Sequence, residues 1–327
     1  MSPQQLLRSL RLPLMAAPMS IASTVQLVEA ACRAGVMGCF PTHNAARGGG
    51  LHTWLDHLVQ AIAAERDAGC NPAPFAVNIN VSRRKDPAVL AEEIAACRRV
   101  RAPVVTTNVG DPTEVVRQVQ DWGGIVIHDA TTVAQAERAA AAGVDGLMLV
   151  CAGAGGLGGL LTPFAFVPRV RAFFPGIIQL AGGVSTGRGI AAAILLGADM
   201  VCMGTRFIAT RESGVEDGHK QMLAASDIGD VLWTDAICGV GGNFLRPSIV
   251  GNGLDPDRLP RPDERGRPAI PPTVKPWKMV WSGGQSVGMI RDVPTVAELV
   301  DALEVDYRRA IDVFGAGIEA REGVRPR

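Results

Sequence analysis

The sequence Ile-Ile-Gln-Leu-Ala-Gly-Gly at residues 177–183 and the sequence Met-Val-Cys-Met-Gly-Thr-Arg at residues 200–206 decide the fold. Each stretch is a short apolar run that ends in glycine, and a helix of small residues is expected between them. Glycines let backbone amides approach an anion closely, and the N-terminus of a following helix adds partial positive charge. Two such turns in succession predict a phosphate site after the last two strands of an eight-stranded α/β barrel.

The rest of the chain alternates between strand-like apolar runs and helical patterns. Strands are expected at 12–17, 36–40, 75–80, 104–107, 125–128, 146–150, 177–181 and 200–203, and helices at 24–34, 51–68, 87–99, 112–122, 133–142, 163–174, 187–196 and 215–225. Eight strands that are each followed by a helix predict an α/β fold with parallel strands closed into a (β/α)8 TIM barrel. An open doubly wound sheet is disfavoured, because its first strand should end in GxGxxG and this one ends in Ala-Ala-Pro-Met.

The alternation stops after Ser226, and residues 233–272 are rich in Gly, Pro and Asp. This composition predicts an inserted or appended irregular or helical segment near the C-terminus. A last amphipathic helix is expected over 295–318, with Thr295 and Glu298 forming a capping box. We therefore expect a barrel at 1–213, an inserted lid or small subdomain at 214–280, and a C-terminal segment at 281–327 that returns to the barrel.

Composition excludes several classes of partner. The 327 residues carry a formal net charge of +0, which gives no basic footprint for nucleic acid, and 47% are hydrophobic, enough for a large core. No apolar run is long enough to cross a membrane, and the seven scattered cysteines suit a reducing, cytoplasmic setting. His52 and His57 are five residues apart, so no metal site is expected. The expected partner is a small-molecule substrate, and a homodimer stays open.

The carboxyl ends of the expected strands carry amides, hydroxyls and imidazoles but few charges. A charge-poor pocket with one phosphate site suits flavin mononucleotide (FMN), whose ring needs backbone and amide hydrogen bonds. The loop at 151–159 has five glycines in nine residues and would allow close approach to a flat ring.

These motifs together resemble the nitronate monooxygenase family, formerly called nitropropane dioxygenases. That family comprises FMN-dependent barrels and also takes in flavin-dependent enoyl reductases. The resemblance spans residues 12–213 and resumes at 281–285 with the closing helix. The motifs that carry it are Ala17-Pro18-Met19, Phe75-Ala76-Val77-Asn78, Val126-Ile127-His128-Asp129, the 151–159 loop, Ala181-Gly182-Gly183, Met203-Gly204-Thr205-Arg206-Phe207 and Trp281-Ser282-Gly283-Gly284-Gln285.

The resemblance implies which residues bind the flavin. Ala17, Pro18 and Met19 would pack beside it. Its ring would be contacted by Asn80 and His128, together with the loop residues Gly155 and Gly156. Its phosphate would be held by Ala181, Gly182, Gly183, Met203, Gly204 and Thr205, and Gln285 would approach the flavin from the C-terminal segment. For His128 the alternative is a hydrogen-bonded histidine that closes a strand.

One departure from the family pattern concerns the expected proton-transfer residue. The family's loop usually continues Ala-Gly-Gly-His, and this chain has Leu157 at the histidine position. Leucine cannot exchange a proton, so His43 is the candidate catalytic replacement, with a surface-loop histidine as the alternative. Cys151 is expected to pack in the core rather than react. His219 lies in a polar stretch and is expected to be solvated.

Three functions stay open. The first is an FMN-dependent oxidation of a small nitronate, or a similar carbanion-like substrate, with oxygen as the acceptor. The second is an NAD(P)H-dependent reduction of an enoyl-thioester or quinone, which Leu157 and the basic run Arg83-Arg84-Lys85 favour. The third is flavin binding without turnover.

Overall fold

The computed structural model describes residues 1–46, 48–264, 266–268 and 270–322. Its centre is a closed barrel of eight parallel strands in the order β1-β2-β3-β4-β5-β6-β8-β9. The strands are β1 Leu14–Ala16, β2 Met37–Pro41, β3 Ala76–Asn80, β4 Val104–Asn108, β5 Ile125–Ala130, β6 Gly146–Val150, β8 Ile177–Ala181 and β9 Met200–Met203. Strand β1 pairs with both β2 and β9, which closes the ring and confirms the predicted fold.

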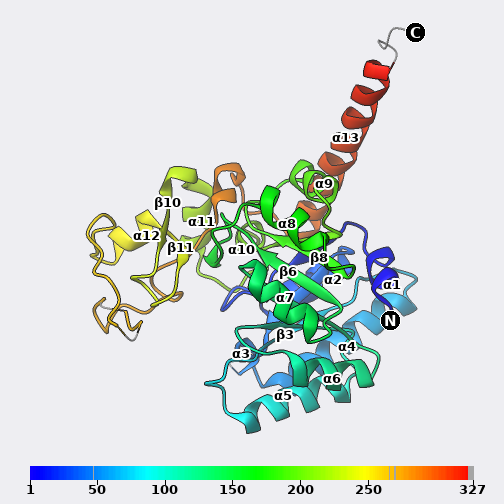
Figure 1. Cartoon of the computed structure of the whole chain (residues 1–327), viewed down its shortest axis with the longest axis horizontal. Helices are drawn as coiled ribbons and strands as arrows, with labels where there is room; N and C mark the ends of the chain where they lie inside the picture. Colours follow the sequence, from blue (N-terminus) through cyan, green and yellow to red (C-terminus); the bar gives the residue numbers. More distant parts are fainter. Residues whose placement is uncertain (47, 265, 269, 323–327) are drawn as a thin grey trace.

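Helices surround the barrel (Figure 1). They are α2 Val25–Arg33, α3 Thr42–Ala45, α4 Leu51–Asp67, α5 Pro87–Arg99, α6 Thr113–Asp121, α7 Val133–Ala141, α8 Pro163–Arg171, α9 Gly187–Leu195, α10 Thr205–Ile208 and α11 Asp217–Ala225. Their starts follow local chemistry, since the side chains of Thr24, Asp86 and Thr186 each accept a hydrogen bond from a first-turn amide. The eight helices expected from the sequence are present, with ends shifted by a few residues.

The strands bury both of their faces. Outward side chains pack under the helices, and inward side chains such as Met15, Ile127 and Met200 form a separate apolar cluster inside the barrel. Helix α1 (Pro3–Arg8) places the fully buried Leu6 in this inner cluster, at the amino-terminal end of the strands. Because this end is filled, an internal site has room only at the carboxyl end.

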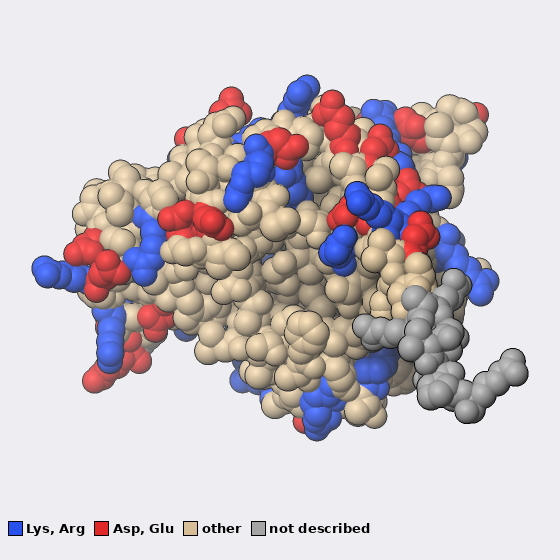
Figure 2. All heavy atoms as spheres, turned by 90° about the horizontal axis from the view of Figure 1, so that it is seen from above, with Lys and Arg blue, Asp and Glu red and all other residues tan. Residues whose placement is uncertain are grey.

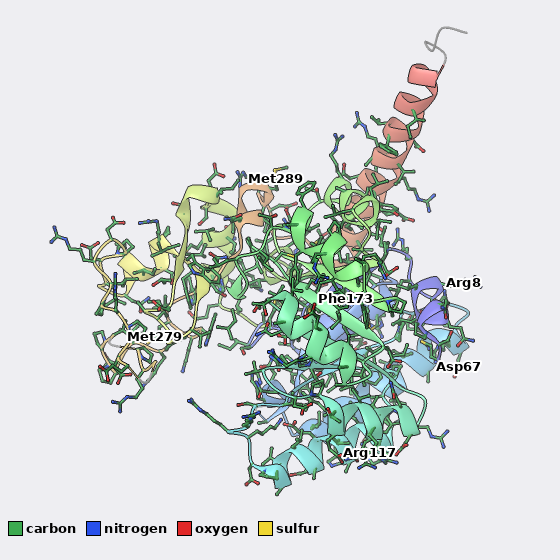
Figure 3. All side chains as sticks on the ribbon, in the orientation of Figure 1. Arg8, Asp67, Arg117, Phe173, Met279 and Met289 are labelled. Carbon is green, nitrogen blue, oxygen red and sulfur yellow. The ribbon has the colours of Figure 1, made fainter. Side chains whose placement is uncertain are left out.

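A small lobe, residues 228–282, lies beside the barrel. It holds the 3₁₀ turn η1 (Ile228–Asp230), β10 (Val231–Thr234), β11 (Gly242–Leu245) and α12 (Arg246–Gly251), and Figure 3 shows Met279 within it. Strand β11 pairs antiparallel with β10 and with β7 (Gly156–Leu157), which belongs to the loop after β6. The lobe has its own apolar cluster around Phe244 and Ile249. The sequence indicated an irregular segment here, and it missed these three short strands.

The chain returns to the barrel through η2 (Gln285–Met289) and α13 (Val296–Glu322). Leu299, Val300 and Leu303 of α13 join the core outside the strands. Thr295 and Glu298 exchange hydrogen bonds at the start of the helix, as the capping-box pattern predicts. The helix then projects away from the barrel (Figure 1). Residues 323–327 of the predicted C-terminal segment lie outside the described residues.

Charged side chains of both signs are interspersed on the face shown in Figure 2. This agrees with the neutral net charge of the whole sequence. Within the described chain, no helix combines the length and the apolarity that a membrane crossing needs.

Candidate active site

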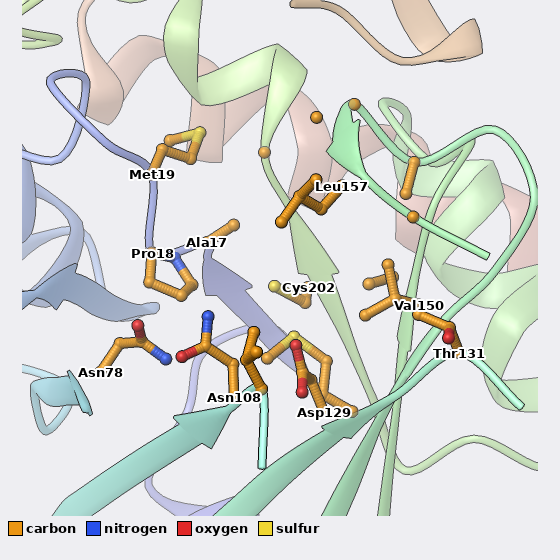
Figure 4. Close-up of a pocket in the computed structure, with 18 of the residues that line it drawn as sticks. Ala17, Pro18, Met19, Asn78, Asn108, Asp129, Thr131, Val150, Leu157 and Cys202 are labelled. Carbon is orange, nitrogen blue, oxygen red and sulfur yellow. The ribbon is translucent and has the colours of Figure 1, made fainter. Parts of the chain in front are cut away.

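A cavity of ≈1220 Å³ lies at the carboxyl ends of the barrel strands (Figure 4). Its floor is made by the strand ends, and its roof by the 151–159 loop and the small lobe. The predicted site residues that line it are Ala17, Pro18, Met19, His43, Asn80, His128, Gly155, Gly156, Ala181, Gly182, Gly183, Gly204 and Thr205. The sequence therefore brought together residues from seven strand ends that the structure places around one space.

Two predicted flavin contacts do not border this cavity. The Met203 side chain is buried in the core outside the strands. Gln285 is exposed and lies against Gly153, whose carbonyl oxygen accepts from the Gln285 backbone amide at 2.9 Å. Backbone atoms of both residues shape the site, because the Met203 carbonyl accepts from the Ala17 amide at 3.0 Å.

The two glycines after β8 differ in their surroundings. Gly182 has φ +118°, and a Cβ there would lie 3.0 Å from the Cys151 carbonyl oxygen, so the 151–159 loop requires glycine at this position. Gly183 has φ +74°, and no atom would lie within 4 Å of its Cβ. Gly183 therefore presents open backbone to the cavity, as a phosphate-binding turn must.

The turn after β1 is held by Asn44. The Asn44 amide nitrogen donates to the Met19 carbonyl at 2.9 Å, and its oxygen accepts from the Ile21 backbone amide at 3.1 Å. Ile21 has φ +70°, which is strained for a β-branched residue. Ser23 also donates to the Ala17 carbonyl at 2.9 Å. These bonds fix the Ala17-Pro18-Met19 wall of the cavity.

His43 and Leu157 both border the cavity. His43 Nε2 lies 2.9 Å from Ser20 Oγ in a side-chain hydrogen bond. Leu157 sits on β7, is 45% exposed and points into the space in Figure 4. Position 157 is thus at the site, and its leucine carries no proton-transfer group. The catalytic role of His43 stays a prediction.

His128 is held by its strand neighbour. The His128 ring nitrogen Nδ1 lies 2.8 Å from the Thr107 hydroxyl, and both side chains are buried. Burial lowers the pKa of His128 to about 4, and the Asp111 carboxylate opposes this shift. The imidazole is therefore neutral near pH 7, which suits a hydrogen-bonding residue at the end of a strand.

Sequence reasoning named Asp129 only as the last residue of the motif at 126–129 and gave it no role in the site. Ile125, Ile127 and Asp129 share the inward face of β5, because side chains alternate along a strand. Asp129 borders the cavity, and burial raises the pKa of its carboxyl to about 7. The alternation rule alone would have placed it on the floor.

Other floor groups are neutral. Asn108 lines the cavity, and its Oδ1 is buried with no hydrogen-bond partner among the described residues. The Asn78 amide donates to Thr106 Oγ1 at 3.0 Å. Cys202 also lines the floor, and burial raises the pKa of its thiol. Cys151 is packed in the core, as predicted, and burial raises its pKa to about 12.

The expectation for His219 was wrong. Its side chain is buried and lines the roof of the cavity. The ring stacks on Trp281 with centroids 5.1 Å apart, and Nε2 contacts the Ser282 carbonyl at 3.0 Å. Burial lowers its pKa to about 4. The polar residues near His219 in the sequence indicated exposure, and nothing local predicts its contact with the distant residues Trp281 and Ser282.

The basic run contributes one side chain to the site. Arg83 lines the cavity, whereas Lys85 forms an ion pair with Glu93 on α5. Arg84 is exposed.

The residues present fit a flavin. The cavity exceeds the roughly 300–1,000 Å³ of ordinary small-molecule sites, so a cofactor and a substrate have room together. Gly183 offers the open turn that a phosphate needs, and the unpaired Asn108 oxygen offers an acceptor to a ring N–H. Apart from Asp129, the floor groups named above are neutral, which suits an uncharged ring system.

A closed parallel barrel with a large cavity at the carboxyl ends of its strands defines a (β/α)8-barrel enzyme that acts on small molecules. A model of the family described as nitronate monooxygenase matches residues 4–306. The chain belongs to the nitronate monooxygenase family, and it is a flavin-dependent oxidoreductase.

Individual relatives agree with this assignment. A nitronate monooxygenase from Paraburkholderia phytofirmans is 27% identical over 92% of this chain and 93% of that protein. A (3aS,4S,5R,7aS)-5-hydroxy-7a-methyl-1-oxo-octahydro-1H-indene-4-carboxyl-CoA dehydrogenase from Rhodococcus jostii is 25% identical over 74% of this chain and 80% of that protein. Among solved structures, FabK from Thermotoga maritima is 25% identical with a TM-score of 0.72, over 95% of this chain and 97% of that one.

Proposed function

We propose that the protein is an FMN-dependent enzyme that oxidises a small nitronate, or a similar carbanion-like substrate, with oxygen as the acceptor. The observation that carries this proposal is the open Gly183 turn on a cavity large enough for cofactor and substrate. The name of the Paraburkholderia relative supports nitronate as the substrate.

The chain's own residues would hold and shield the reactants. The Gly183 turn and Gly204 would hold the phosphate, and the Asn44-braced wall at Ala17-Pro18-Met19 would fix the ring edge. FMN, when bound, supplies the redox chemistry. Leu157 and Trp277 on the roof would exclude water from the reacting atoms. Because Leu157 cannot remove a proton, a substrate that is already ionised suits this site better than a neutral nitroalkane.

A second candidate function is an NAD(P)H-dependent reduction of an enoyl-thioester or quinone. Arg83 on the cavity wall favours it, since a guanidinium there can meet the phosphates of a CoA thioester or of NADPH. The Rhodococcus relative is named for a CoA-ester substrate, which supports the same class.

The test is the visible spectrum of the purified protein, followed by anaerobic mixing with an alkyl nitronate or with NADPH. Bleaching of a bound flavin by the nitronate, with recovery in air, supports the first function. Bleaching by NADPH alone supports the second. A preparation that stays colourless after incubation with excess FMN overturns both.

A further inference from the structure

Asp129 is a carboxyl on the floor of the cavity. In Figure 4 its side chain is drawn to the right of Asn108 and below Cys202, and it points into the space below Leu157. It reaches this place because β5 alternates and Asp129 follows the inward Ile125 and Ile127. Any ligand that fills the floor of the cavity lies close to this carboxyl.

The surroundings of Asp129 offer little to stabilise a negative charge. Burial raises the pKa of its carboxyl to about 7, the Val109 backbone amide opposes that shift by hydrogen bonding, and no cation in the described chain is among the causes. Across the floor, burial keeps the Cys202 thiol neutral by raising its pKa. Next along the strand, the lowered pKa of His128 keeps that ring neutral.

The remaining charged groups border the cavity at other places. Asp111 and Arg83 come from the loops after β4 and β3, and His43 comes from α3 after β2. Arg138 borders the cavity from α7 and His219 from α11, and neither is among the causes of the Asp129 shift. Asp111 is the closest comparison to Asp129, because it is also a carboxyl on the cavity wall. Its pKa is lowered, chiefly because the Thr113 hydroxyl donates to it. The two carboxyls of this cavity thus have pKa values that are shifted in opposite directions, that of Asp129 upward and that of Asp111 downward.

A second negative charge in the cavity would act directly on Asp129. Like charges in a poorly solvated site repel strongly, and the cheapest response of a carboxylate is to bind a proton. The proton comes from solvent through the cavity, an O–H bond forms on the carboxyl, and no electrons move to or from Asp129.

We propose that Asp129 is the proton-exchanging group of this cavity: it binds one proton when negative charge enters and releases that proton when the charge leaves. The identity of the anions rests on the proposed function, which makes them a nitronate substrate and the reduced flavin. By binding and releasing this proton, Asp129 would keep the net charge of the cavity constant while the bound flavin is reduced and reoxidised.

The first test measures the midpoint potential of the bound flavin from pH 5.5 to 9 in the wild-type protein and in D129N. Above about pH 7 the wild type is expected to take up one proton more per two electrons than D129N, which the slope of potential against pH reports. Below that pH the slopes should agree, because Asp129 is already protonated. D111N is the matched control and should keep the wild-type slope. Equal slopes for D129N and wild type across the whole range would overturn the proposal.

The second test needs no flavin. Aspartate labelled with ¹³C in the side chain, assigned by comparison with D129N, reports the titration of Asp129 in the flavin-free protein. A midpoint near pH 7 supports the proposal, and a midpoint below pH 5 overturns it. A protein that takes up no flavin but whose Asp129 titrates near pH 7 would refute the proposed function while supporting the proton-exchanging carboxyl.

Discussion

The floor and the roof of the cavity are built by different means. The floor consists of the ends of barrel strands, where the sheet register sets the positions of Asn78, Asn108 and Asp129. The roof depends on contacts between distant segments, such as the Asn243 amide to the Ala154 carbonyl at 2.7 Å and the Gly284 amide to Thr205 Oγ1 at 2.9 Å. The floor is polar and the roof presents Leu157 and Trp277. Under the proposed function, this difference would let the barrel fix the cofactor site while changes in the roof alter the choice of substrate.

The largest expected effect comes from changing the roof at Leu157. L157H puts an imidazole, which can accept a proton, on the cavity lining. If the proposed function holds, we expect the rate with a neutral nitroalkane to rise roughly 10²- to 10⁴-fold, with little change for the nitronate. Steady-state kinetics on both forms of the substrate measure this. L160H is the control, because Leu160 directly follows the 151–159 loop but is 70% exposed and outside the cavity lining. An equal increase of the nitroalkane rate in L157H and L160H would show that the effect does not depend on the place of residue 157 in the cavity roof.

Next in size is a charge at the floor's open turn. G183E and G183A share the backbone strain of φ +74°, but only G183E places a carboxylate beside the proposed phosphate. Like-charge contact costs several kcal/mol, so G183E should bind FMN at least about a hundredfold more weakly than G183A. Fluorescence titration of the flavin-free proteins measures both affinities. Similar FMN affinities of the two variants would show that the phosphate does not bind at this turn.

A smaller effect concerns Asp129 and the stability of the floor. Its pKa is raised from 3.8 to about 7, so the folded state holds a proton that the unfolded state has lost between these values. Wild-type stability should therefore fall as pH rises from about 4 to 7 and then level off. D129N escapes this loss and should be more stable than wild type above pH 7, by at most about 4 kcal/mol.

Thermal unfolding of the flavin-free protein between pH 4 and 9 measures the difference between D129N and wild type. D111N is again the comparison. Its stability should fall below that of wild type as the pH rises above about 4, whereas that of D129N should rise above it. The Asp111 pKa is lowered, so its carboxylate stabilises the fold above about pH 4 and this contribution is lost on acidification. A constant gap between D129N and wild type would contradict the raised pKa.

The smallest expected effect loosens the roof. N243A removes the bond to the Ala154 carbonyl and should cost about 1 kcal/mol, since a typical hydrogen bond contributes 0.5–1.5 kcal/mol. The loss should show as faster limited proteolysis of the 151–159 loop. N252A removes bonds inside the small lobe, from Asn252 to the Ser248 and Met279 carbonyls, and should leave that loop protected.

The same contrast explains what the sequence could predict. Barrel strands were found because each is an apolar run that ends at a polar or glycine turn, such as 177–183, and the pattern repeats along the chain. Most of the candidate site followed, because parallel strands bring their carboxyl ends together. Asp129 was not predicted as a site residue, because the sequence analysis considered only its neighbour His128 as a flavin contact.

The roof was not predictable in this way. Strands β7, β10 and β11 have only two to four residues each, which is too short for a periodic signal. Their pairing joins residues 156–157 to 242–243, and no local pattern encodes that contact. His219 was misplaced for the same reason, since its partner Trp281 comes from a distant segment.

Strand β7 carries Leu157, and β11 sets its register through the pairs Gly242 with Leu157 and Asn243 with Gly156. Side chains alternate along a strand, so a slip of β7 by one residue against β11 would turn position 157 away from the cavity without disturbing the barrel. A change in this register is thus a route, besides point substitution, by which the roof can present a different side chain to the cavity.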